Sequence, residues 1–358
     1  MVTARIIGLG TALPGGPIAQ DALWDGFFAR HHGGGRLAAR IFRDAGVRHR
    51  QAVANPLADD DVTRWSTGDR MRRYATESVP LGKGAVAAAL ADAELAAEDV
   101  GLFAVASCTG YATPGLDIRV AADLGMAPGV QRLVIGHMGC YAAVPALGAV
   151  ADFAAARDRP AVLLALELPS LHVQPPTDDI GQVVSHALFG DAAVALVVAP
   201  GVGPGLEVVE VAAVTDPATA DHMSWDVTDQ GFRMGLSPRV PDVLGRHVRP
   251  MVERLLQANG LGVRDVDAWA VHPGGPRILD TVQDHLGLPA DALAASRAVL
   301  AAHGNCSSAT VPLVIDALRT AGRPRPGGHA VALAFGPGLT LYAALLRAPE
   351  RHQEDDPR

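Results

Sequence analysis

Three residues of this chain, a cysteine, a histidine and an asparagine, are of the right types to catalyse acyl transfer together. Cys140 follows a short apolar run and precedes an alanine-rich segment, so we expect it between a buried strand and a buried helix. The free N–H groups and positive end of that helix would lower the pKa of the thiol and make it a nucleophile. The alternative is a small buried apolar residue, which is what most free cysteines are.

His272 and Asn305 stand in glycine-containing turns of the second half, in Val271-His-Pro-Gly-Gly-Pro276 and His303-Gly-Asn-Cys-Ser-Ser308. A cysteine and a histidine can form a thiolate–imidazolium pair, the activated nucleophile of covalent acyl transfer. The amide of Asn305 and an N–H of His272 could hold the oxygen of a thioester carbonyl while decarboxylation turns it into an enolate. Each residue also has a structural explanation, as a backbone-bonded histidine and as a helix N-cap.

The hypothesis requires no metal ion and no organic cofactor, because loss of carbon dioxide itself generates the carbanion. The three cysteines, Cys108, Cys140 and Cys306, are far apart and form no Cys-x-x-Cys pair. This spacing argues against a disulfide framework or a zinc cluster and favours a reducing cytoplasm. Lys83 is the single lysine, and its surroundings offer no partner for Schiff-base chemistry.

The composition indicates a soluble globular protein rather than a nucleic-acid or membrane protein. The chain has 358 residues, of which 49% are hydrophobic, and a formal net charge of −8. It is long enough to bury a large core in two domains or two fused halves. We find no apolar run of transmembrane length and no signal peptide at the N-terminus, so we expect a cytoplasmic protein.

Apolar runs alternate with helical patterns, which predicts an α/β protein. Two matched segment pairs indicate duplication: residues 140–152 resemble 306–318, and residues 188–196 resemble 334–342. We place the boundary in the glycine-rich loop at 201–205, giving an N-terminal half at 1–203 and a C-terminal half at 204–358.

Two local expectations concern the first half. Residues 67–95 look helical in two pieces, with the break at Pro80. Residues 187–198 look like the strand that closes this half.

Four motifs now carry a resemblance to a known family. They are Gly139-Cys140, His272-Pro-Gly-Gly-Pro276, Gly304-Asn-x-Ser-Ser-Ala309 and Phe335-Gly-Pro-Gly-Leu-Thr340. In this order they resemble the type III polyketide synthases, the chalcone synthase-like enzymes of the thiolase fold, over nearly the whole chain. The resemblance implies two duplicated βαβαβαββ halves in a layered α-β-α-β-α architecture, and a homodimer.

The same resemblance implies the reaction. Cys140 would hold the growing acyl chain, and His272 and Asn305 would decarboxylate malonyl-CoA and stabilise the enolate. The substrates would be an acyl-CoA starter and a malonyl-CoA-type extender, with an acyl carrier protein left open as a second source of acyl groups. Repeated condensation and cyclisation would release a product of the pyrone, resorcinol or phloroglucinol type.

Further residues take roles only through the resemblance. Phe189 and Met234 would gate the passage from the CoA tunnel to an interior cavity, with Phe232 as the runner-up for Met234. The cavity-lining residues would be Cys108, His172 and Ser307, and the CoA-binding residues Arg40, Arg43 and Arg48. Because Cys108 and His172 replace threonines that line the plant cavity, we expect a product other than a chalcone.

Three alternatives remain at this point. A ketoacyl-ACP synthase III shares the cysteine, histidine and asparagine but lacks Pro-Gly-Gly-Pro after the histidine. An acyltransferase would load Cys140 without elongating the chain. A catalytically silent CoA- or lipid-binding protein would keep the fold and do neither.

Overall fold

The computed structural model describes residues 3–59 and 61–350. Its main feature is a mixed sheet of nine strands in the order β11-β12-β13-β8-β1-β7-β6-β4-β5. The strands of the first half are β1 (Ala4–Ala12), β4 (Leu102–Ser107), β5 (Gln131–Gly136), β6 (Ala161–Glu167) and β7 (Ala192–Pro200). Those of the second half are β8 (Leu206–Thr215), β11 (Val266–Val271), β12 (His329–Gly336) and β13 (Thr340–Arg347).

The helices of the two halves differ in number. The first half holds α1 (Gln20–Leu23), α2 (Ala29–His31), α3 (Arg36–Asp44), α4 (Thr67–Asp92), α5 (Leu116–Asp123), α6 (Ala143–Arg157) and α7 (Ile180–Leu188). The second half holds α8 (Val240–Ala258), α9 (Pro276–Leu286), α10 (Ala294–His303) and α11 (Thr310–Thr320). Two short pairs complete the fold: β2 (Ile18–Ala19) with β3 (His49–Arg50), and β9 (Met223–Thr228) with β10 (Gly231–Leu236).

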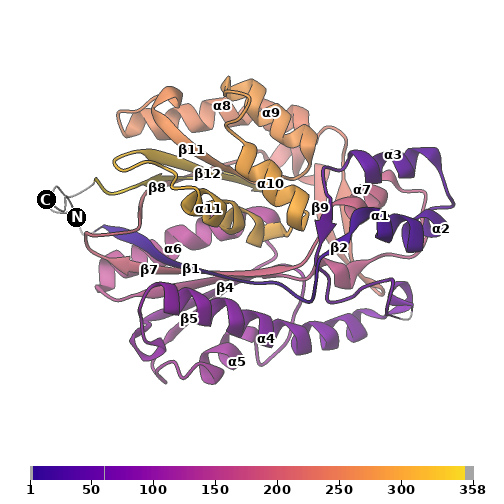
Figure 1. Cartoon of the computed structure of the whole chain (residues 1–358), viewed down its shortest axis with the longest axis horizontal. Helices are drawn as coiled ribbons and strands as arrows, with labels where there is room; N and C mark the ends of the chain where they lie inside the picture. The colour runs from indigo at the N-terminus through magenta and orange to yellow at the C-terminus, as the bar shows by residue number, and fades with distance from the viewer. Residues whose placement is uncertain (1–2, 60, 351–358) are drawn as a thin grey trace, which may run out of the picture.

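The fold has five layers, because helices pack against both faces of each half-sheet (Figure 1). The helices α6 and α11 lie between the two half-sheets and share one apolar core with both. On the outer faces, α4 covers the first half-sheet and α8 and α9 cover the second. Strands buried on both faces read as continuous apolar runs, which is why β4 and β6 were visible in the sequence.

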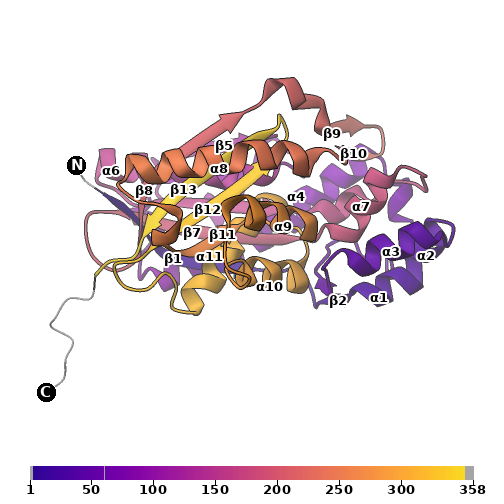
Figure 2. The ribbon, with the colours of Figure 1, turned by 90° about the horizontal axis from the view of Figure 1, so that it is seen from above.

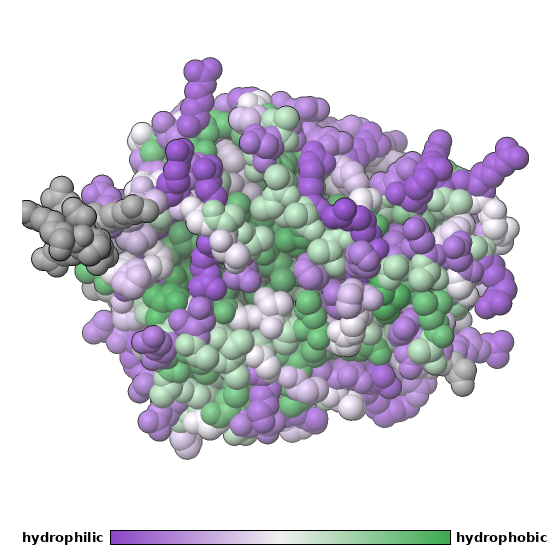
Figure 3. All heavy atoms as spheres, viewed as in Figure 1, coloured by the Kyte–Doolittle hydropathy of each residue, from purple (hydrophilic) through white to green (hydrophobic). Residues whose placement is uncertain are grey.

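The helix α6 is mainly apolar because most of it packs between the half-sheets, and its charged residues Asp152 and Arg157 are exposed. Together with the preceding turn, it forms the stretch Gly139–Arg157, which by length and composition alone could cross a membrane. However, 61% of its 18-residue apolar stretch is buried inside the protein. Alanines and glycines let the two half-sheets approach this helix closely, as in the core of a layered fold. It is therefore a core helix. The face in Figure 3 mixes charged and apolar side chains.

The duplication is incomplete in one strand. In the first half the order is β1, α4, β4, α5, β5, α6, β6 and β7, with α7 before the last strand. In the second half, α10 occupies the place that corresponds to β5, so the expected third strand is not found among the described residues. As a result β5 is an edge of the sheet with no counterpart at the other end.

Two local expectations were wrong. The helix α4 continues through Pro80, which lies on its exposed side, so water can bind the carbonyl that loses its partner. Residues 187–188 end α7 instead of beginning a strand, and β7 starts only at Ala192. The end of α7 and the helices α1–α3 gather at one end of the molecule (Figures 1 and 2).

Candidate active site

Cys140 lies in a tight turn that only glycine permits. Residues Gly139–Tyr141 form a single 3₁₀ turn between β5 and α6. Gly139 has φ of +73°, and a Cβ there would lie 2.8 Å from the Cδ atom of Pro337. The backbone therefore enters the helix from a left-handed residue, and the cysteine is placed at the start of a buried helix as the sequence predicted.

The orientation of the Asn305 amide is fixed by the turn in which it lies. Its Oδ1 atom accepts a hydrogen bond from the N–H of Ser307 at 2.9 Å. Ser307 has φ of +48°, an unusual backbone conformation for a residue with a side chain. With the oxygen occupied, the NH₂ group is the part of the amide left to donate to a ligand.

His272 follows β11 and is 1% exposed. Its backbone N–H donates to the carbonyl of Leu333 at 2.8 Å, which fixes the residue to the next strand. Its ring meets that of Phe335 edge to face, at 5.3 Å between centroids and 72° between planes. The Nδ1 atom has no hydrogen-bond partner among the described residues, so the ring is held mainly by packing.

A cleft of about 740 Å³ brings these three residues together. It is lined by Cys140, His272 and Asn305. In the sequence, Cys140 lies more than a hundred residues before the other two. Much of the remaining wall is apolar and comes from α7, from the hairpin β9–β10 and from the start of α8. An apolar cleft with a few convergent polar groups is the usual form of a small-molecule site.

Burial keeps the cysteine and histidine neutral in the resting site. It raises the pKa of the Cys140 thiol to about 12, although a hydrogen bond with Ser307 opposes this rise, and the Glu167 carboxylate raises it further. Burial also lowers the pKa of His272 to about 3. The expected lowering of the thiol pKa is therefore wrong for this structure, because removing the sulfur from water outweighs the effect of the helix end. A neutral imidazole remains able to accept the thiol proton during reaction.

A small chamber of about 30 Å³ lies on the inner side of Cys140. It is lined by Cys108, Ser307 and Cys140. The sulfur of Cys108 lies 3.4 Å from the hydroxyl oxygen of Ser307. Phe189 and Met234 line both this chamber and the large cleft, as do Cys140 and Met223. The gate role expected of Phe189 and Met234 stays a prediction.

His172 and Phe232 lie behind the chamber, against a separate pocket of about 40 Å³. The ring of His172 bonds to the carbonyl of Thr109 at 2.7 Å and accepts the N–H of Phe232 at 3.0 Å, so both ring nitrogens are occupied. Phe232 stacks on this ring at 4.5 Å between centroids. Of the two candidates for the second gate position, Met234 faces the cleft and Phe232 does not.

The sequence analysis missed Glu167 and Trp225. The buried carboxylate of Glu167 accepts hydrogen bonds from the Cys108 N–H at 3.0 Å, the Thr109 hydroxyl at 2.7 Å and the Ser308 hydroxyl at 2.5 Å. A single charge ending the apolar run of β6 was a signal for it, because such charges are rarely buried without partners. Trp225 lines the chamber, and no sequence pattern indicated this.

The basic residues near the cleft are only partly those expected. Arg40 lines the cleft, and so does Arg277, at the start of α9, which the sequence analysis did not single out. Arg43 is exposed and pairs with its neighbour Asp44 at 3.0 Å. Arg48 is also exposed, but neither Arg43 nor Arg48 lines the cleft.

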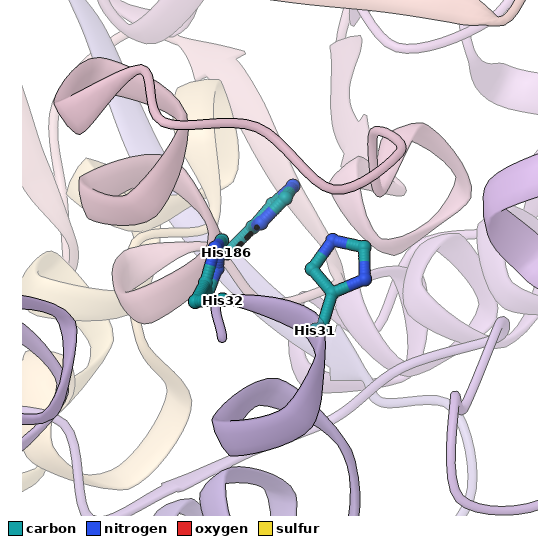
Figure 4. A group of neighbouring side chains, drawn as sticks. All are labelled: His31, His32 and His186. Carbon is teal, nitrogen blue, oxygen red and sulfur yellow. Dashed lines mark hydrogen bonds between the residues drawn. The ribbon is translucent and has the colours of Figure 1, made fainter. Parts of the chain in front are cut away.

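Three histidines lie together between the end of α2 and α7: His31, His32 and His186, with ligand atoms within 4.8 Å of one another (Figure 4). The Gln174 N–H donates to Nε2 of His186 at 3.1 Å, so the proton of this neutral ring is on Nδ1, which faces Nε2 of His32 at 3.2 Å. Metal binding through Nδ1 would move that proton to Nε2, directly opposite the Gln174 N–H. The cluster therefore fits a chain of neutral imidazoles better than a metal centre.

Fold and site together define a condensing enzyme of the thiolase-like fold. Residues 2–204 match the model of the N-terminal domain of chalcone and stilbene synthases, and residues 207–349 match that of the C-terminal domain. The chain therefore belongs to this family, the type III polyketide synthases.

Named relatives in sequence and in structure agree with this family assignment. The chain is 34% identical over 320 residues to the alpha-pyrone synthesis polyketide synthase-like Pks18 of Mycobacterium tuberculosis, covering 86% of this chain and 81% of the relative. It is 36% identical over 317 residues to the 1,3,6,8-tetrahydroxynaphthalene synthase of Streptomyces peucetius subsp. caesius, covering 87% and 83%. The crystal structure of the tetrahydroxynaphthalene synthase of Streptomyces coelicolor A3(2) superposes with a TM-score of 0.90 at 29% identity, covering 97% and 100%. The expected family, fold and main function are confirmed.

The neutral resting state of the site predicts how Cys140 reacts with iodoacetamide. Because the thiolate is the reactive form, we expect the alkylation rate to rise about tenfold per pH unit between roughly pH 6 and 9. Peptide mass spectrometry would separate Cys140 from Cys108 and Cys306. A rate that is constant over this range would instead show a preformed thiolate–imidazolium pair.

Proposed function

We propose that Cys140 is the residue that carries the acyl chain. Its sulfur attacks the carbonyl carbon of an acyl-CoA starter, and the neutral imidazole of His272 accepts the thiol proton. The new carbon–sulfur bond replaces the one to CoA, and CoA leaves as a thiol after taking up a proton. The free ring nitrogen that the lowered pKa of His272 provides supports this role.

Asn305 and His272 then act on malonyl-CoA in the same cleft. Their N–H groups bind the thioester oxygen, the bond to the carboxylate breaks, and carbon dioxide leaves as the electron pair forms an enolate. The enolate carbon attacks the acyl group on Cys140, a carbon–carbon bond forms and the Cys140 thiolate leaves. The extended chain, now on CoA, can reload Cys140 and repeat the cycle.

The observation that carries this proposal is the fixed orientation of Asn305 within the cleft shared with Cys140 and His272. With Oδ1 bonded to Ser307, the amide presents donors, as a group that stabilises negative charge on oxygen must.

Radiolabelled malonyl-CoA with a panel of acyl-CoA starters tests these roles. We expect wild type to release carbon dioxide and form labelled pyrones or resorcinols. Cys140→Ala should abolish labelled products yet retain decarboxylation, whereas His272→Ala and Asn305→Ala should lower decarboxylation at least about 100-fold. Acyl loading without release of carbon dioxide would identify an acyltransferase. Failure to load any acyl-CoA, with loading from an acyl carrier protein, would move the starter to that partner.

Trp225 bounds the inner chamber and points to a short product. It stands opposite Met234 in the β9–β10 hairpin, and its indole N–H donates to the carbonyl of Cys108 at 2.8 Å. The chamber beside Trp225 has a volume of about 30 Å³, which holds roughly two waters. We therefore propose a small ring of the α-pyrone class, as the name of the mycobacterial relative indicates for that protein, rather than the two fused rings of tetrahydroxynaphthalene.

Enlarging the chamber should lengthen the product. In Trp225→Ala we expect products with at least one more malonyl unit, because the indole no longer fills the space beside Cys140. Trp225→Phe, which keeps a ring in place, is the matched control and should retain the wild-type product. Mass spectrometry of the products decides between them, and an unchanged chain length in a folded Trp225→Ala enzyme would show that another residue sets the limit.

We propose that Arg40 and Arg277 bind the phosphates of CoA at the mouth of the cleft, since both line it and guanidinium groups bind phosphates with two donors. Arg43 and Arg48 were also expected to do so, but they face solvent away from the lining. We expect Arg277→Ala and Arg40→Ala each to raise the KM for malonyl-CoA about tenfold with little change in kcat. Arg43→Ala is the control, and an equal rise in its KM would contradict this selection.

The edge strand β5 supports a homodimer. Its Leu133 and Val134 are 39% and 59% exposed, and the nearby Ile118 is 43% exposed. An unprotected apolar edge normally requires a cover, and we propose a second copy of this chain. Light scattering should give a dimer for wild type and a monomer for Val134→Arg. A monomeric wild type at micromolar concentration would refute the proposal.

We propose that the enzyme acts in the cytoplasm, where CoA thioesters are available and its three free cysteines, all buried, stay reduced. We also propose that CoA thioesters suffice as substrates, without a metal ion or organic cofactor, because decarboxylation supplies the nucleophilic electron pair.

A further inference from the structure

We propose that Arg50 is a positioning residue for decarboxylation: its guanidinium fixes the end of α7, and the backbone just beyond that end holds Asn305. The proposal rests on the role given above to Asn305. Arg50 lies in β3 and does not line the large cleft, so it acts on the reaction only through other residues.

The guanidinium of Arg50 binds several acceptors at once. Its Nη1 atom donates to the carbonyls of His186 at 2.8 Å and Phe189 at 2.7 Å. Its Nη2 atom donates to the carbonyl of Ala187 at 2.7 Å and to the side chain of Gln20. The last carbonyls of a helix have no partners within it and carry partial negative charge, so a buried cation is well placed there.

This cation has few other ways to be satisfied. Arg50 is 5% exposed, and burial lowers its pKa to about 10, which leaves it charged at neutral pH. The nearest opposite charge is the buried Asp191, which is itself bonded to Val53 and Ser170. The carbonyls of α7 are therefore the direct partners of the guanidinium. The position of the guanidinium and the geometry of the end of α7 depend on one another.

The residues that follow α7 hold Asn305 by its backbone. The N–H of Asn305 donates to the carbonyl of Leu188 at 2.8 Å, and its own carbonyl accepts the N–H of Gly190 at 3.1 Å. Phe189, whose carbonyl Arg50 binds, is the residue between these two contacts. Gly304 makes this approach possible, since a Cβ there would lie 2.5 Å from the Leu188 carbonyl oxygen. Arg50 thus sets the position of Asn305 through one short stretch of backbone.

Replacing Arg50 by lysine tests this arrangement. Lysine keeps the charge but loses the planar fork, so it cannot bind all of these acceptors together. A displacement of Asn305 approaching 1 Å should lower kcat for malonyl-CoA decarboxylation about 10- to 100-fold. The KM for malonyl-CoA should change less than about threefold, as should the rate of acyl loading on Cys140, because neither depends on the Asn305 amide alone.

Arg5→Lys is the matched control. The guanidinium of Arg5 also binds three backbone carbonyls, those of Gly201, Val202 and Pro204, in the loop between the halves. None of these residues lines the large cleft. A general effect of replacing a carbonyl-binding arginine should therefore appear in both variants, and a specific loss of decarboxylation only in Arg50→Lys.

A double-mutant cycle with Asn305→Ala supplies a readout that general destabilisation would not change. If Arg50 acts through Asn305, Arg50→Lys should cost little more decarboxylation once Asn305 is alanine. Multiplicative losses, or equal losses in Arg50→Lys and Arg5→Lys, would overturn the proposal. Should Asn305→Ala leave decarboxylation intact, the proposed role of Asn305 fails, which is a different result.

If Arg50→Lys does not fold, Gln20→Met provides the test. It removes one acceptor of Nη2 and the Gln20 contact with the Ala187 carbonyl, but leaves the arginine in place. A smaller fall in decarboxylation, with acyl loading unchanged, supports the proposal. Unchanged decarboxylation in the folded variant overturns it.

Discussion

The structure depends on the burial of two helices, α6 and α11, between two half-sheets. Both helices are mainly apolar, and their buried residues belong to one core shared with both half-sheets. The turns that precede them carry Cys140 and Asn305, so the packing of the core fixes these two residues relative to each other. Because interiors pack as densely as organic crystals, such positions tolerate little movement.

The same burial determines the electrostatics of the site. Withdrawal from water disfavours the charged forms of both Cys140 and His272, and the neighbouring carboxylate of Glu167 adds to the effect on the thiol. The thiol proton therefore has to move as the substrate reacts and is not removed in advance. A site of this kind protects a buried sulfur from reaction with other electrophiles, because only the thiolate is strongly nucleophilic.

Much of the site could be predicted because its residues lie in short motifs whose glycines and prolines shape turns. Gly139 beside Cys140 is an example, since it has a left-handed conformation and Pro337 leaves no room for a Cβ there. The buried strands β4 and β6 were equally visible as apolar runs. Family resemblance then suggested Phe189 and Met234 as gate residues, and both line the cleft and the chamber.

The features that sequence reasoning missed depend on contacts between distant segments. The end of α7 is apolar enough to look like the strand that follows it, but it is a helix whose last carbonyls bind Arg50, from β3. Pro80 looked like a helix boundary, but its exposed position lets α4 continue. The pKa of Cys140 could not be predicted because it depends on the depth of burial and not on neighbours in sequence.

The β9–β10 hairpin has a consequence for how this enzyme could change its product. It is separate from the nine-stranded sheet and is held by side chains from other elements, including Gln174, whose amide donates to the Phe232 carbonyl at 3.1 Å. Trp225 and Met234 face each other across its two strands. One fourteen-residue segment thus carries both the wall of the chamber and one side of its entrance. Under the roles proposed for Trp225 and Met234, substitutions within this one segment would alter the product while the helices that follow Cys140 and Asn305 stay intact.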